Sequence, residues 1–284
     1  MPELPEVEIV KRGLDPVMRS QVINECEIFR SNLRYPFPPD FCEVLRGAKV
    51  ESLCRRGKYL LIYLSNGYGL IWHLGMSGSV KIFPAKQSYP SFERVKHDHV
   101  VIHMQGGAVI VYHDPRRFGF MLLEKTENLN CIRPFSKMGP EPLGNAFNGD
   151  VLAELLQGRK SNIKAALLDQ NVIAGIGNIY ACEALYMARI DPARICTSLD
   201  KKEVESLARS VRQVLQKAIQ AGGSSLKDYC HTDGNLGYFQ HMFGVYNREG
   251  ENCPDCDCDL SVTGGVQRIV QNGRSTFYCP RQQN

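Results

Sequence analysis

Four cysteines gather in the last 32 residues of the chain, in a pattern that predicts a metal site. Cys253 and Cys256 are separated by two residues, Cys279 follows after a long gap, and Arg268 and Arg274 come shortly before it. Zinc prefers thiolate ligands and can hold together a hairpin too small to have its own core. The pattern therefore predicts a zinc-stapled β-hairpin that presents arginines. A reduced thiol cluster on a hairpin held by packing is the alternative.

The fourth ligand of such a site has one thiolate candidate. A second cysteine pair would end at position 282, where this chain has Gln282. Cys258 can supply the fourth thiolate, although it follows Cys256 so closely that the turn must be distorted. We expect one zinc per chain. The other seven cysteines lie singly between Cys26 and Cys230, which is typical of reduced thiols rather than of a disulfide framework.

Two short segments carry side chains suited to contact with DNA. Arg116, Arg117 and Phe118 follow the turn-like pair Asp114-Pro115, and Met76 lies in a glycine-bearing segment. Arginine, phenylalanine and methionine at loop tips can enter a duplex when a base is extracted from the stack. Composition alone favours a different interpretation of Met76 and Phe118, namely packing in the core.

These segments need a rigid support, and residues 48–123 are expected to provide it as β-structure. Two tight-turn dipeptides, at 66–67 and 106–107, predict hairpins. In the first, residues 60–64 should pair with 70–74, and in the second, 99–104 with 108–113. Helical spacing before them predicts a helix over 7–18.

A proline- and glycine-rich stretch over 132–148 predicts a linker and a domain boundary. Helical patterns follow it. The clearest begins after Asp200, with Glu203 as its capping-box partner, and ends at Gly222-Gly223. Shorter helices are expected over 151–156, 163–168 and 179–188, the last two joined by a glycine turn that could bind phosphate, a weak signal when taken alone.

Composition places broad limits on function. With 284 residues, 43% of them apolar, the chain can bury a core without help, and a formal charge of +4 permits a polyanionic partner without requiring one. The sequence has no apolar run long enough to span a bilayer, and its start is unlike a secretion signal. We therefore expect a cytoplasmic protein that does not bind membranes.

The motifs together resemble those of bacterial formamidopyrimidine-DNA glycosylases, from the first residue to within a few of the last. Leu4 and Val7 favour this branch over the related endonuclease VIII, which acts mainly on oxidised pyrimidines. The segments that carry the resemblance are 1–8 (MPELPEVE), 56–60 (RGKYL), 73–78 (HLGMSG), 96–99 (KHDH), 114–119 (DPRRFG), 175–180 (GIGNIY) and 273–279 (GRSTFYC).

The resemblance implies an α+β fold with three domains. These are an N-terminal helix plus β-sandwich catalytic domain over 1–133, a linker and helix-two-turn-helix domain over 134–235, and a zinc-finger β-hairpin over 236–284. Double-stranded DNA containing oxidised bases would lie in the cleft between the halves, and the protein is expected to be a monomer.

The resemblance also implies a reaction. Pro2, exposed as the N-terminus after removal of Met1, would attack C1′ of the damaged nucleotide and form a Schiff base. Glu3 would protonate O4′ as general acid. Lys58 would donate a proton during β-elimination, and Arg274 would act in δ-elimination, more plausibly as a phosphate clamp because arginine rarely gives up its proton.

Further residues are implied as contacts to DNA. Met76, Arg116 and Phe118 would fill the space left by the extruded base, while Lys58 and Arg274 would help to hold the flanking phosphates. The stretch 221–236, which contains Ser224, Ser225, Lys227 and Tyr229, would cover the flipped base. The remaining implied contacts are His73, His97, Lys160, Lys164 and Asn178.

Three functions stay open at this point. The first is a base excision repair glycosylase that removes 8-oxoguanine and formamidopyrimidines and cuts the strand by β,δ-elimination. The second is the same chemistry on oxidised pyrimidines, as in endonuclease VIII. The third is a non-catalytic DNA-binding zinc protein, against which the presence of Pro2, Glu3 and Lys58 argues.

Overall fold

A computed structural model describes residues 2–85, 93–224, 232, 237–257 and 259–284. The chain forms two compact units, and each is described by itself. They are Met1–Ser136 with Ala221–Tyr238, and Lys137–Gln220 with Phe239–Asn284. The division into domains 1–133, 134–235 and 236–284 stays a prediction beside these two units.

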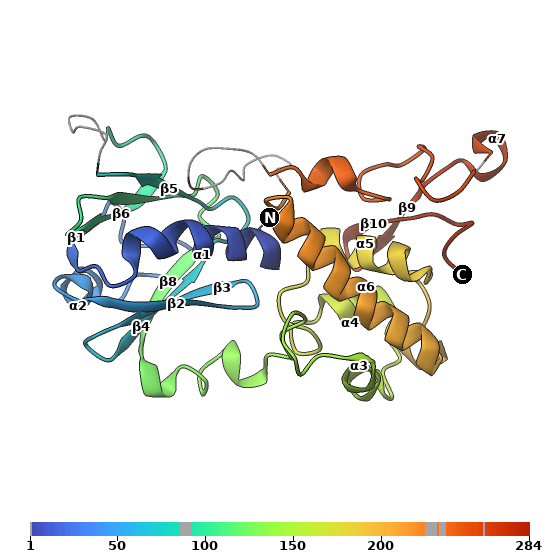
Figure 1. The fold of residues 1–284 in the computed structure, drawn as a ribbon, viewed down its shortest axis with the longest axis horizontal. Coiled ribbons are helices and arrows are strands. Elements are labelled where there is room, and N and C mark those ends of the chain that lie inside the picture. The colour runs from blue at the N-terminus through green and yellow to red at the C-terminus, as the bar shows by residue number, and fades with distance from the viewer. Residues whose placement is uncertain (1, 86–92, 225–231, 233–236, 258) are drawn as a thin grey trace. The chain divides into compact units, whose positions relative to one another are not determined.

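The first unit contains two four-stranded antiparallel sheets (Figure 1). The strand order is β1-β6-β7-β5 in one sheet and β2-β3-β4-β8 in the other. The elements are α1 (Leu4–Met18), β1 (Ile23–Ile28), α2 (Phe41–Leu45), β2 (Val50–Arg56), β3 (Tyr59–Leu64), β4 (Tyr68–His73), β5 (Ser79–Phe83), β6 (Asp98–Met104), β7 (Val109–His113), β8 (Phe120–Lys125) and the 3-10 turns η1 (Thr126–Asn128) and η2 (Phe135–Lys137).

Both hairpins expected from the turn dipeptides are present. Strand β3 pairs with β4, and β6 pairs with β7. Gly67 and Gly107 take φ of +78° and +83°, a left-handed conformation that favours glycine. Local turn chemistry therefore fixes these two pairings.

The core of the first unit lies between the sheets, which makes this part a β-sandwich as expected. The Trp72 ring of β4 meets the Tyr112 ring of β7 edge-on at 5.3 Å, and both are fully buried. Helix α1 adds buried residues at helical spacing, among them Val7, Val10 and Leu14. The helix begins three residues earlier than the expected 7–18, because Glu3 caps it.

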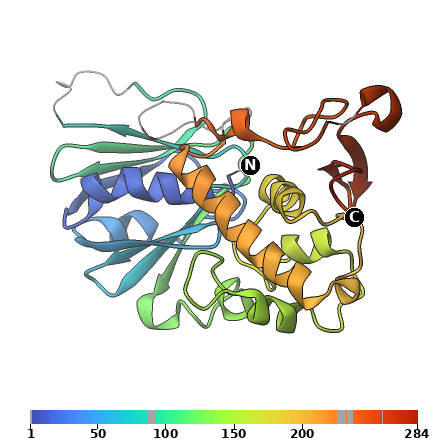
Figure 2. The same ribbon diagram turned by 45° about the vertical axis from the view of Figure 1, so that its right-hand side comes forward.

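The second unit is mainly helical and ends in a two-stranded hairpin. Helix α6 begins with the expected capping box, in which the Glu203 carboxylate accepts the Asp200 N–H and the Asp200 carboxylate accepts the Glu203 N–H, both at 2.8 Å. It packs against α3 and α5 (Figure 2). The elements are α3 (Gly149–Leu156), α4 (Ile163–Leu168), α5 (Asn178–Ala188), η3 (Cys196–Ser198), α6 (Lys201–Gln220), η4 (Phe239–Met242), α7 (Leu260–Thr263), β9 (Gln267–Gln271) and β10 (Arg274–Tyr278).

The expected linker over 132–148 contains one turn of 3-10 helix, η2, and otherwise has no helix or strand before α3. The three shorter helices lie within two residues of the expected ranges. None of the helices in the described part of the chain has the length and apolarity that a membrane span needs.

Candidate functional site

Pro2 and Glu3 are the expected nucleophile and the expected general acid, and both are buried where α1 starts. Glu3 is the N-cap of α1 and forms a capping box with Glu6, in which the Glu3 backbone N–H donates to Glu6 Oε2 at 2.8 Å. Glu3 and Glu6 are 2% and 1% exposed. Because Pro2 directly precedes this cap, the helix start holds the expected nucleophile against the core.

Lys58 lies in the two-residue turn between β2 and β3, where Gly57 takes φ of +57°. Its ammonium is close enough to His73, the last residue of β4, to act on the charge state of that ring. Burial is the largest cause that lowers the pKa of His73, and the charge of Lys58 is the next. The turn therefore places two expected DNA contacts together.

His73 is a neutral side chain near pH 7, since its pKa is lowered to about 4. The Gly75 N–H donates to its Nδ1 at 3.1 Å, so Nε2 carries the ring proton. The ring stacks on Phe120, with centroids 5.1 Å apart and planes 15° apart. His73 can therefore donate a hydrogen bond to a phosphate oxygen, but it brings no positive charge.

A buried carboxylate joins loops 74–78 and 114–119. These loops carry Met76, Arg116 and Phe118, the side chains expected to act as a wedge in the space left by the extruded base. Asp114 is 0% exposed and accepts from the Ser77 hydroxyl at 2.6 Å, the Gly119 N–H at 2.8 Å and the Tyr112 hydroxyl at 3.1 Å. The loops also touch directly, because a Cβ added at Gly75 would lie 2.2 Å from the Gly119 nitrogen. Loops 74–78 and 114–119 therefore form one body.

The tips of these joined loops point their large side chains outward. Met76 is 37% exposed and Phe118 is 42% exposed, so the core packing that composition favours for both residues is wrong. The Arg116 guanidinium lies over the Phe118 ring, 5.0 Å from its centroid. The loops are anchored to Asp114 through the Ser77 hydroxyl and the Gly119 N–H, so Met76 and Phe118 take no part in the anchoring and remain in solvent.

His97 stands beside the same loops. It takes φ of +76°, and its carbonyl oxygen accepts the Asp114 N–H at 3.0 Å. Its ring centroid lies 5.9 Å from that of His113. The structure thus gathers His97 with the wedge loops in the first unit.

In the second unit, Lys164 lies beneath the hairpin strand β10. It is 1% exposed, and its Nζ donates to the Thr276 hydroxyl at 2.6 Å and to the Ser275 carbonyl at 3.2 Å. The Asn178 Nδ2 donates to the same Ser275 carbonyl at 2.9 Å. A buried ammonium that donates hydrogen bonds to a strand stabilises that strand. The buried position of Lys164 therefore does not favour the expected contact with DNA.

Arg274 and Lys160 are exposed, as phosphate contacts must be. Arg274 is the first residue of β10 and follows the tight turn at Asn272 and Gly273, both with positive φ. Asn178 is the first residue of α5, whose N-cap Gly177 brings no side chain. A helix N-terminus of this kind offers backbone N–H groups to an anion.

Three of the four expected zinc ligands come together at the base of the hairpin. The sulfurs of Cys253 and Cys256 both approach that of Cys279, at 3.5 and 3.7 Å, and are 2.9 Å from each other. Thiolates that share one zinc at about 2.3 Å lie about 3.8 Å apart in a tetrahedron. The separations from Cys279 come near this value, and the separation between Cys253 and Cys256 is shorter. All three sulfurs lie within 4.8 Å of one another, so they could hold one metal ion, while Cys258 lies outside the described residues.

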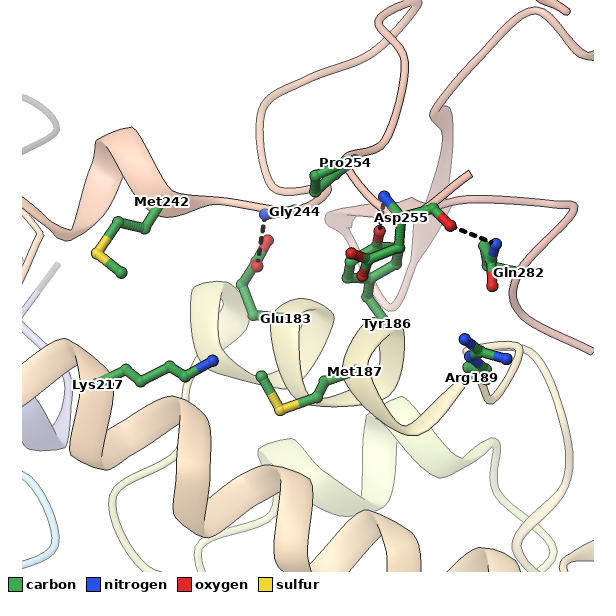
Figure 3. Close-up of a pocket in the computed structure, with 10 residues that line it drawn as sticks. All are labelled: Glu183, Tyr186, Met187, Arg189, Lys217, Met242, Gly244, Pro254, Asp255 and Gln282. Carbon is green, nitrogen blue, oxygen red and sulfur yellow. Dashed lines mark hydrogen bonds between the residues drawn. The ribbon is translucent and has the colours of Figure 1, made fainter. Parts of the chain in front are cut away.

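Gln282 stands near this cluster but is engaged elsewhere. Its Nε2 donates to the Asp255 carbonyl at 3.0 Å (Figure 3). In the same region Glu183 reaches from α5 and accepts the Gly244 N–H at 2.8 Å and the Tyr246 N–H at 2.7 Å. Burial raises the pKa of Glu183, and these N–H groups oppose that shift.

A pocket of about 290 Å³ opens beside Gln282 and Glu183. Lys217, Met242 and Arg189 also line it (Figure 3). None of the expected catalytic or DNA-contacting residues lines this pocket. It belongs to the region around the cysteine cluster, apart from the buried start of α1 that carries Pro2 and Glu3.

The loop expected to cover the flipped base is described in part. Of 221–236, residues 221–224 and 232 are described, and Ser225, Lys227 and Tyr229 lie outside the described residues. Ser224 is buried, and both its N–H and its hydroxyl donate to Glu6.

Sequence reasoning gave no role to several buried carboxylates, of which three bear on the sites above: Asp114, Glu6 and Glu183. Two of them had a local signal. Asp114 precedes a proline at the end of a strand, as residues that bind turn N–H groups often do, and Glu6 stands at the capping-box distance from Glu3. The partners of Glu183 come from Gly244 and beyond, so no local signal pointed to that residue.

Comparison with known proteins gives a consistent result along the chain. The model of the formamidopyrimidine-DNA glycosylase N-terminal domain matches residues 1–121, and that of the formamidopyrimidine-DNA glycosylase H2TH domain matches residues 138–230. A formamidopyrimidine-DNA glycosylase of Azorhizobium caulinodans is 52% identical over 292 residues, covering 98% of each chain.

Solved structures agree in fold. A complex between a Lactococcus lactis FPG mutant and a DNA containing Fapy-dG has a TM-score of 0.87 and 32% identity, covering 100% of both chains. A complex between the Lactococcus lactis enzyme and a DNA containing an abasic site has the same TM-score and identity, covering 99% of both chains.

Proposed function

Because the chain belongs to the formamidopyrimidine-DNA glycosylase family, it is a base excision repair glycosylase with abasic-site lyase activity, and we propose that it excises oxidised purines through a Schiff base on Pro2. One observation carries the assignment of residues. Pro2 and Glu3 occupy the buried start of α1, in a chain that matches the family over its length. Neither the oxidised-pyrimidine function nor the non-catalytic one is favoured by the relatives.

The proposed reaction uses the secondary amine that removal of Met1 leaves on Pro2. Its nitrogen forms a bond to C1′ as the bond from C1′ to the base breaks. Glu3 then gives a proton to O4′, the bond between O4′ and C1′ opens, and a cationic iminium remains. The iminium makes the C2′–H bond acidic: C2′ loses a proton to water and the C3′–O bond breaks, which releases the 3′ phosphate. Loss of a C4′ proton to water then breaks the C5′–O bond and releases the 5′ phosphate.

Lys58 and His73 have distinct proposed parts in this sequence. The Lys58 ammonium, in the β2–β3 turn, donates a proton during β-elimination. His73 holds a flanking phosphate oxygen through its Nε2–H, as a neutral donor. A neutral donor beside Lys58 leaves that ammonium as the charge that faces the phosphate.

We propose that the joined loops 74–78 and 114–119 carry the wedge that replaces the extruded base. Met76 and Phe118 are exposed apolar side chains of a size that can enter the stack, and Arg116 lies over Phe118. Its guanidinium has the donors to bind the base left without a partner. His97, beside these loops, contacts the phosphate chain.

Arg274, Asn178 and Lys160 are the proposed phosphate contacts of the second unit. Arg274 clamps a phosphate from the start of β10, and Asn178 adds the N-terminus of α5. Lys164 acts from beneath, by holding β10 through Ser275 and Thr276. It is therefore a positioning residue in this proposal.

We propose zinc as the metal of the three-thiol cluster, with Cys258 as its fourth ligand. Thiolates are the ligands that zinc prefers in structural sites, and the three sulfurs lie within 4.8 Å of one another. Bound zinc would staple the hairpin and so hold Arg274 in place, with no part in the bond changes.

Borohydride trapping tests the proposed function. The protein, incubated with a duplex that contains 8-oxoguanine opposite cytosine, should become covalently attached to DNA upon reduction. Pro2→Gly should reduce trapping and excision by orders of magnitude and leave DNA affinity nearly intact, because the phosphate contacts are unchanged. A folded wild-type protein that gives no adduct would contradict the assignment, and faster excision of thymine glycol would contradict the purine preference.

Metal analysis tests the zinc proposal. About one zinc per chain is expected, and Cys258→Ser should weaken its retention more than Gln282→Ala does. Should another group fill the fourth position, Cys258→Ser will do little and Gln282→Cys will tighten zinc. A protein without zinc that stays fully active and resists chelators would exclude the metal.

The partner in this proposal is double-stranded DNA bearing the lesion, as in the Lactococcus lactis complexes. The protein acts as a monomer, which sedimentation with and without DNA can check.

A further inference from the structure

Arg55 is a charged residue of the first unit that the proposed reaction does not use. It lies on β2, and 9% of its side chain is exposed. Its Nε donates to Glu8 Oε2 at 3.1 Å, and a second nitrogen of the guanidinium donates to the Gly57 carbonyl, also at 3.1 Å. One guanidinium therefore joins a helix to a tight turn.

The helix is α1, whose start carries the proposed nucleophile and general acid. Glu8 lies little more than one helical turn after Glu3. The helix packs against β2 and β3 (Figure 1), and its side chains Val7 and Val10 are 1% and 0% exposed. The Glu8 carboxylate is therefore a fixed point on the element that begins beside Pro2.

The turn is the one that carries Lys58. Gly57 takes φ of +57°, which favours glycine, and Lys58 follows it between β2 and β3. The carbonyl that accepts from Arg55 belongs to the peptide group that links Gly57 to Lys58. Gly57 has no side chain with which to anchor the turn, so the bond from Arg55 fixes the backbone directly before Lys58.

We propose that Arg55 is a positioning residue that sets the place of the Lys58 ammonium relative to the Pro2 amine. This inference rests on the proposed function, because it takes Pro2 as the nucleophile and Lys58 as the proton donor of β-elimination. The two groups come from different elements and must act on the same sugar, which requires placement to within about 0.5 Å. The guanidinium of Arg55 supplies the link between those elements.

Arginine suits this role because its planar guanidinium holds its donors in a fixed geometry. Two of its nitrogens can bind a carboxylate and a carbonyl at once, and the angle between the two bonds is set by the plane. Arg55→Lys keeps the charge but places all donors on one nitrogen at the end of a flexible chain. The pair with Glu8 can then persist, while the bond to Gly57 is lost.

Arg12→Lys is the matched control. Arg12 donates to the other oxygen of the same Glu8 carboxylate at 2.9 Å, but it lies on α1 itself and its side chain is 60% exposed. The two variants make the same chemical change beside the same carboxylate. They differ in that Arg55 also binds the turn before Lys58.

The experiment measures two rates on a duplex with a pre-made abasic site, at saturating protein and under single-turnover conditions. Borohydride trapping reports formation of the Schiff base on Pro2, and strand cleavage reports elimination. Arg55→Lys should slow cleavage by about tenfold to a hundredfold, because a misplaced donor transfers its proton poorly. Trapping should change by less than about twofold, since the core holds α1. Arg12→Lys should leave both rates as in the wild type.

A double-mutant cycle tests whether Arg55 acts through Lys58. Lys58→Met removes the ammonium, and we expect it to slow cleavage of the abasic duplex more than Arg55→Lys does. In the Lys58→Met background, Arg55→Lys should slow cleavage by less than about twofold, because no ammonium is left to position. A residue that only stabilised the fold would keep its full effect in that background.

Glu8→Gln is the second variant, in case Arg55→Lys does not fold. It keeps the shape of the side chain, removes the charge at the α1 end of the link and leaves Gly57 unchanged. Cleavage should slow by a smaller factor than in Arg55→Lys, again with trapping near the wild-type rate. Urea unfolding of each variant checks that the protein is folded under the assay conditions.

The results separate the inference from the function on which it rests. A wild-type protein that forms no adduct, or a Lys58→Met variant that cleaves at the wild-type rate, overturns the proposed function and the inference with it.

With an active wild type and a slow Lys58→Met variant, three results overturn the positioning role alone. Arg55→Lys could cleave at the wild-type rate, slow trapping as much as cleavage, or keep its full effect in the Lys58→Met background. Equal slowing by Arg12→Lys would do the same. Slow cleavage with wild-type trapping and a non-additive cycle supports the role of Arg55.

Discussion

The wedge loops of the first unit and the hairpin strand of the second are both held by a buried charge, but the charges have opposite signs. The Asp114 carboxylate accepts from Ser77, Tyr112 and Gly119, whereas the Lys164 ammonium donates to β10. In both places the residues at the tips, which are Met76, Arg116 and Phe118 in the loops and Arg274 on the strand, are exposed, and the buried charge binds the backbone or small polar groups beneath them. The charge that anchors is thus separate from the side chains that would bind.

The two buried charges, Asp114 and Lys164, differ in how much of the local structure would be lost without them. Asp114 receives donors from two loops, among them the Gly119 N–H. The Ser275 carbonyl held by Lys164 also accepts from Asn178. Loss of Lys164 leaves that carbonyl a partner, so the strand should tolerate the loss better than the loops tolerate loss of Asp114.

The largest effect is expected from Asp114→Ala. Removal of the carboxylate leaves buried donors unpaired, which should lower the free energy of unfolding by about 3–5 kcal/mol. Urea unfolding measures it, and Asp114→Asn, which keeps one acceptor, should lose less. A loss below about 1 kcal/mol for Asp114→Ala would show that the loops are held by other contacts.

A change in pH tests the same loops through His73. Its pKa is about 4 in the folded chain and near 6.5 when unfolded, so the unfolded state takes up the proton first as pH falls. The contribution of His73 to the free energy of unfolding is complete above about pH 6.5. It is lost progressively as the pH falls to about 4, by up to about 3 kcal/mol, because each unit of difference between the two pKa values corresponds to about 1.36 kcal/mol.

The matched variant for this pH test is His73→Gln. It cannot take up a proton, so its free energy of unfolding should fall less between pH 6.5 and pH 4 than that of the wild type. Equal slopes in urea unfolding across this range would remove His73 as the cause.

A smaller effect is expected from Lys164→Met, which keeps the length of the side chain and removes the donor. The free energy of unfolding should fall by about 1–2 kcal/mol. DNA affinity should fall through displacement of Arg274, while the slope of log affinity against log salt stays as in the wild type. A slope reduced by about 0.9 would instead reveal a direct phosphate contact.

The smallest effect on stability is expected from Lys160→Met, the exposed counterpart of that variant. Stability should stay within about 0.5 kcal/mol, because the side chain is in solvent. The salt slope should fall by about 0.9. An unchanged slope of log affinity against log salt would show that Lys160 does not contact a phosphate. The proposed contrast, in which Lys160 contacts DNA directly and Lys164 acts through β10, would then be wrong.

Features set by neighbouring residues were predictable from the sequence. The hairpins followed from glycine turns such as Gly67, and the start of α6 followed from Asp200 and Glu203. The order of strands within each sheet was not predictable, because β1 pairs with β6 and β4 with β8 across long stretches of chain. Pairing of this kind depends on packing of the whole core.

For the residues of the site, identity was predictable from the sequence and exposure was not. Identities such as Pro2 and Glu3 could be named from the sequence, because a resemblance transfers identity. Exposure could not. Met76 and Phe118 are of types that are usually buried, and Lys164 is of a type that is usually exposed. Lys164 is placed against its type by a partner distant in sequence, since its bond to Ser275 spans 111 residues. Met76 is placed so by its neighbour Ser77, whose bond to Asp114 spans 37 residues.

The close approach of Gly75 to Gly119 has a consequence for conformational entropy. Two separate loops would have to be ordered on the DNA, at about 1–2 kcal/mol for each residue fixed. Here a Cβ at Gly75 would lie 2.2 Å from the Gly119 nitrogen, so the two backbones already restrict each other before any DNA is bound. The conformational entropy of these loops is therefore lost when the protein folds and not when it binds DNA. The binding energy of the wedge is then available to separate the bases.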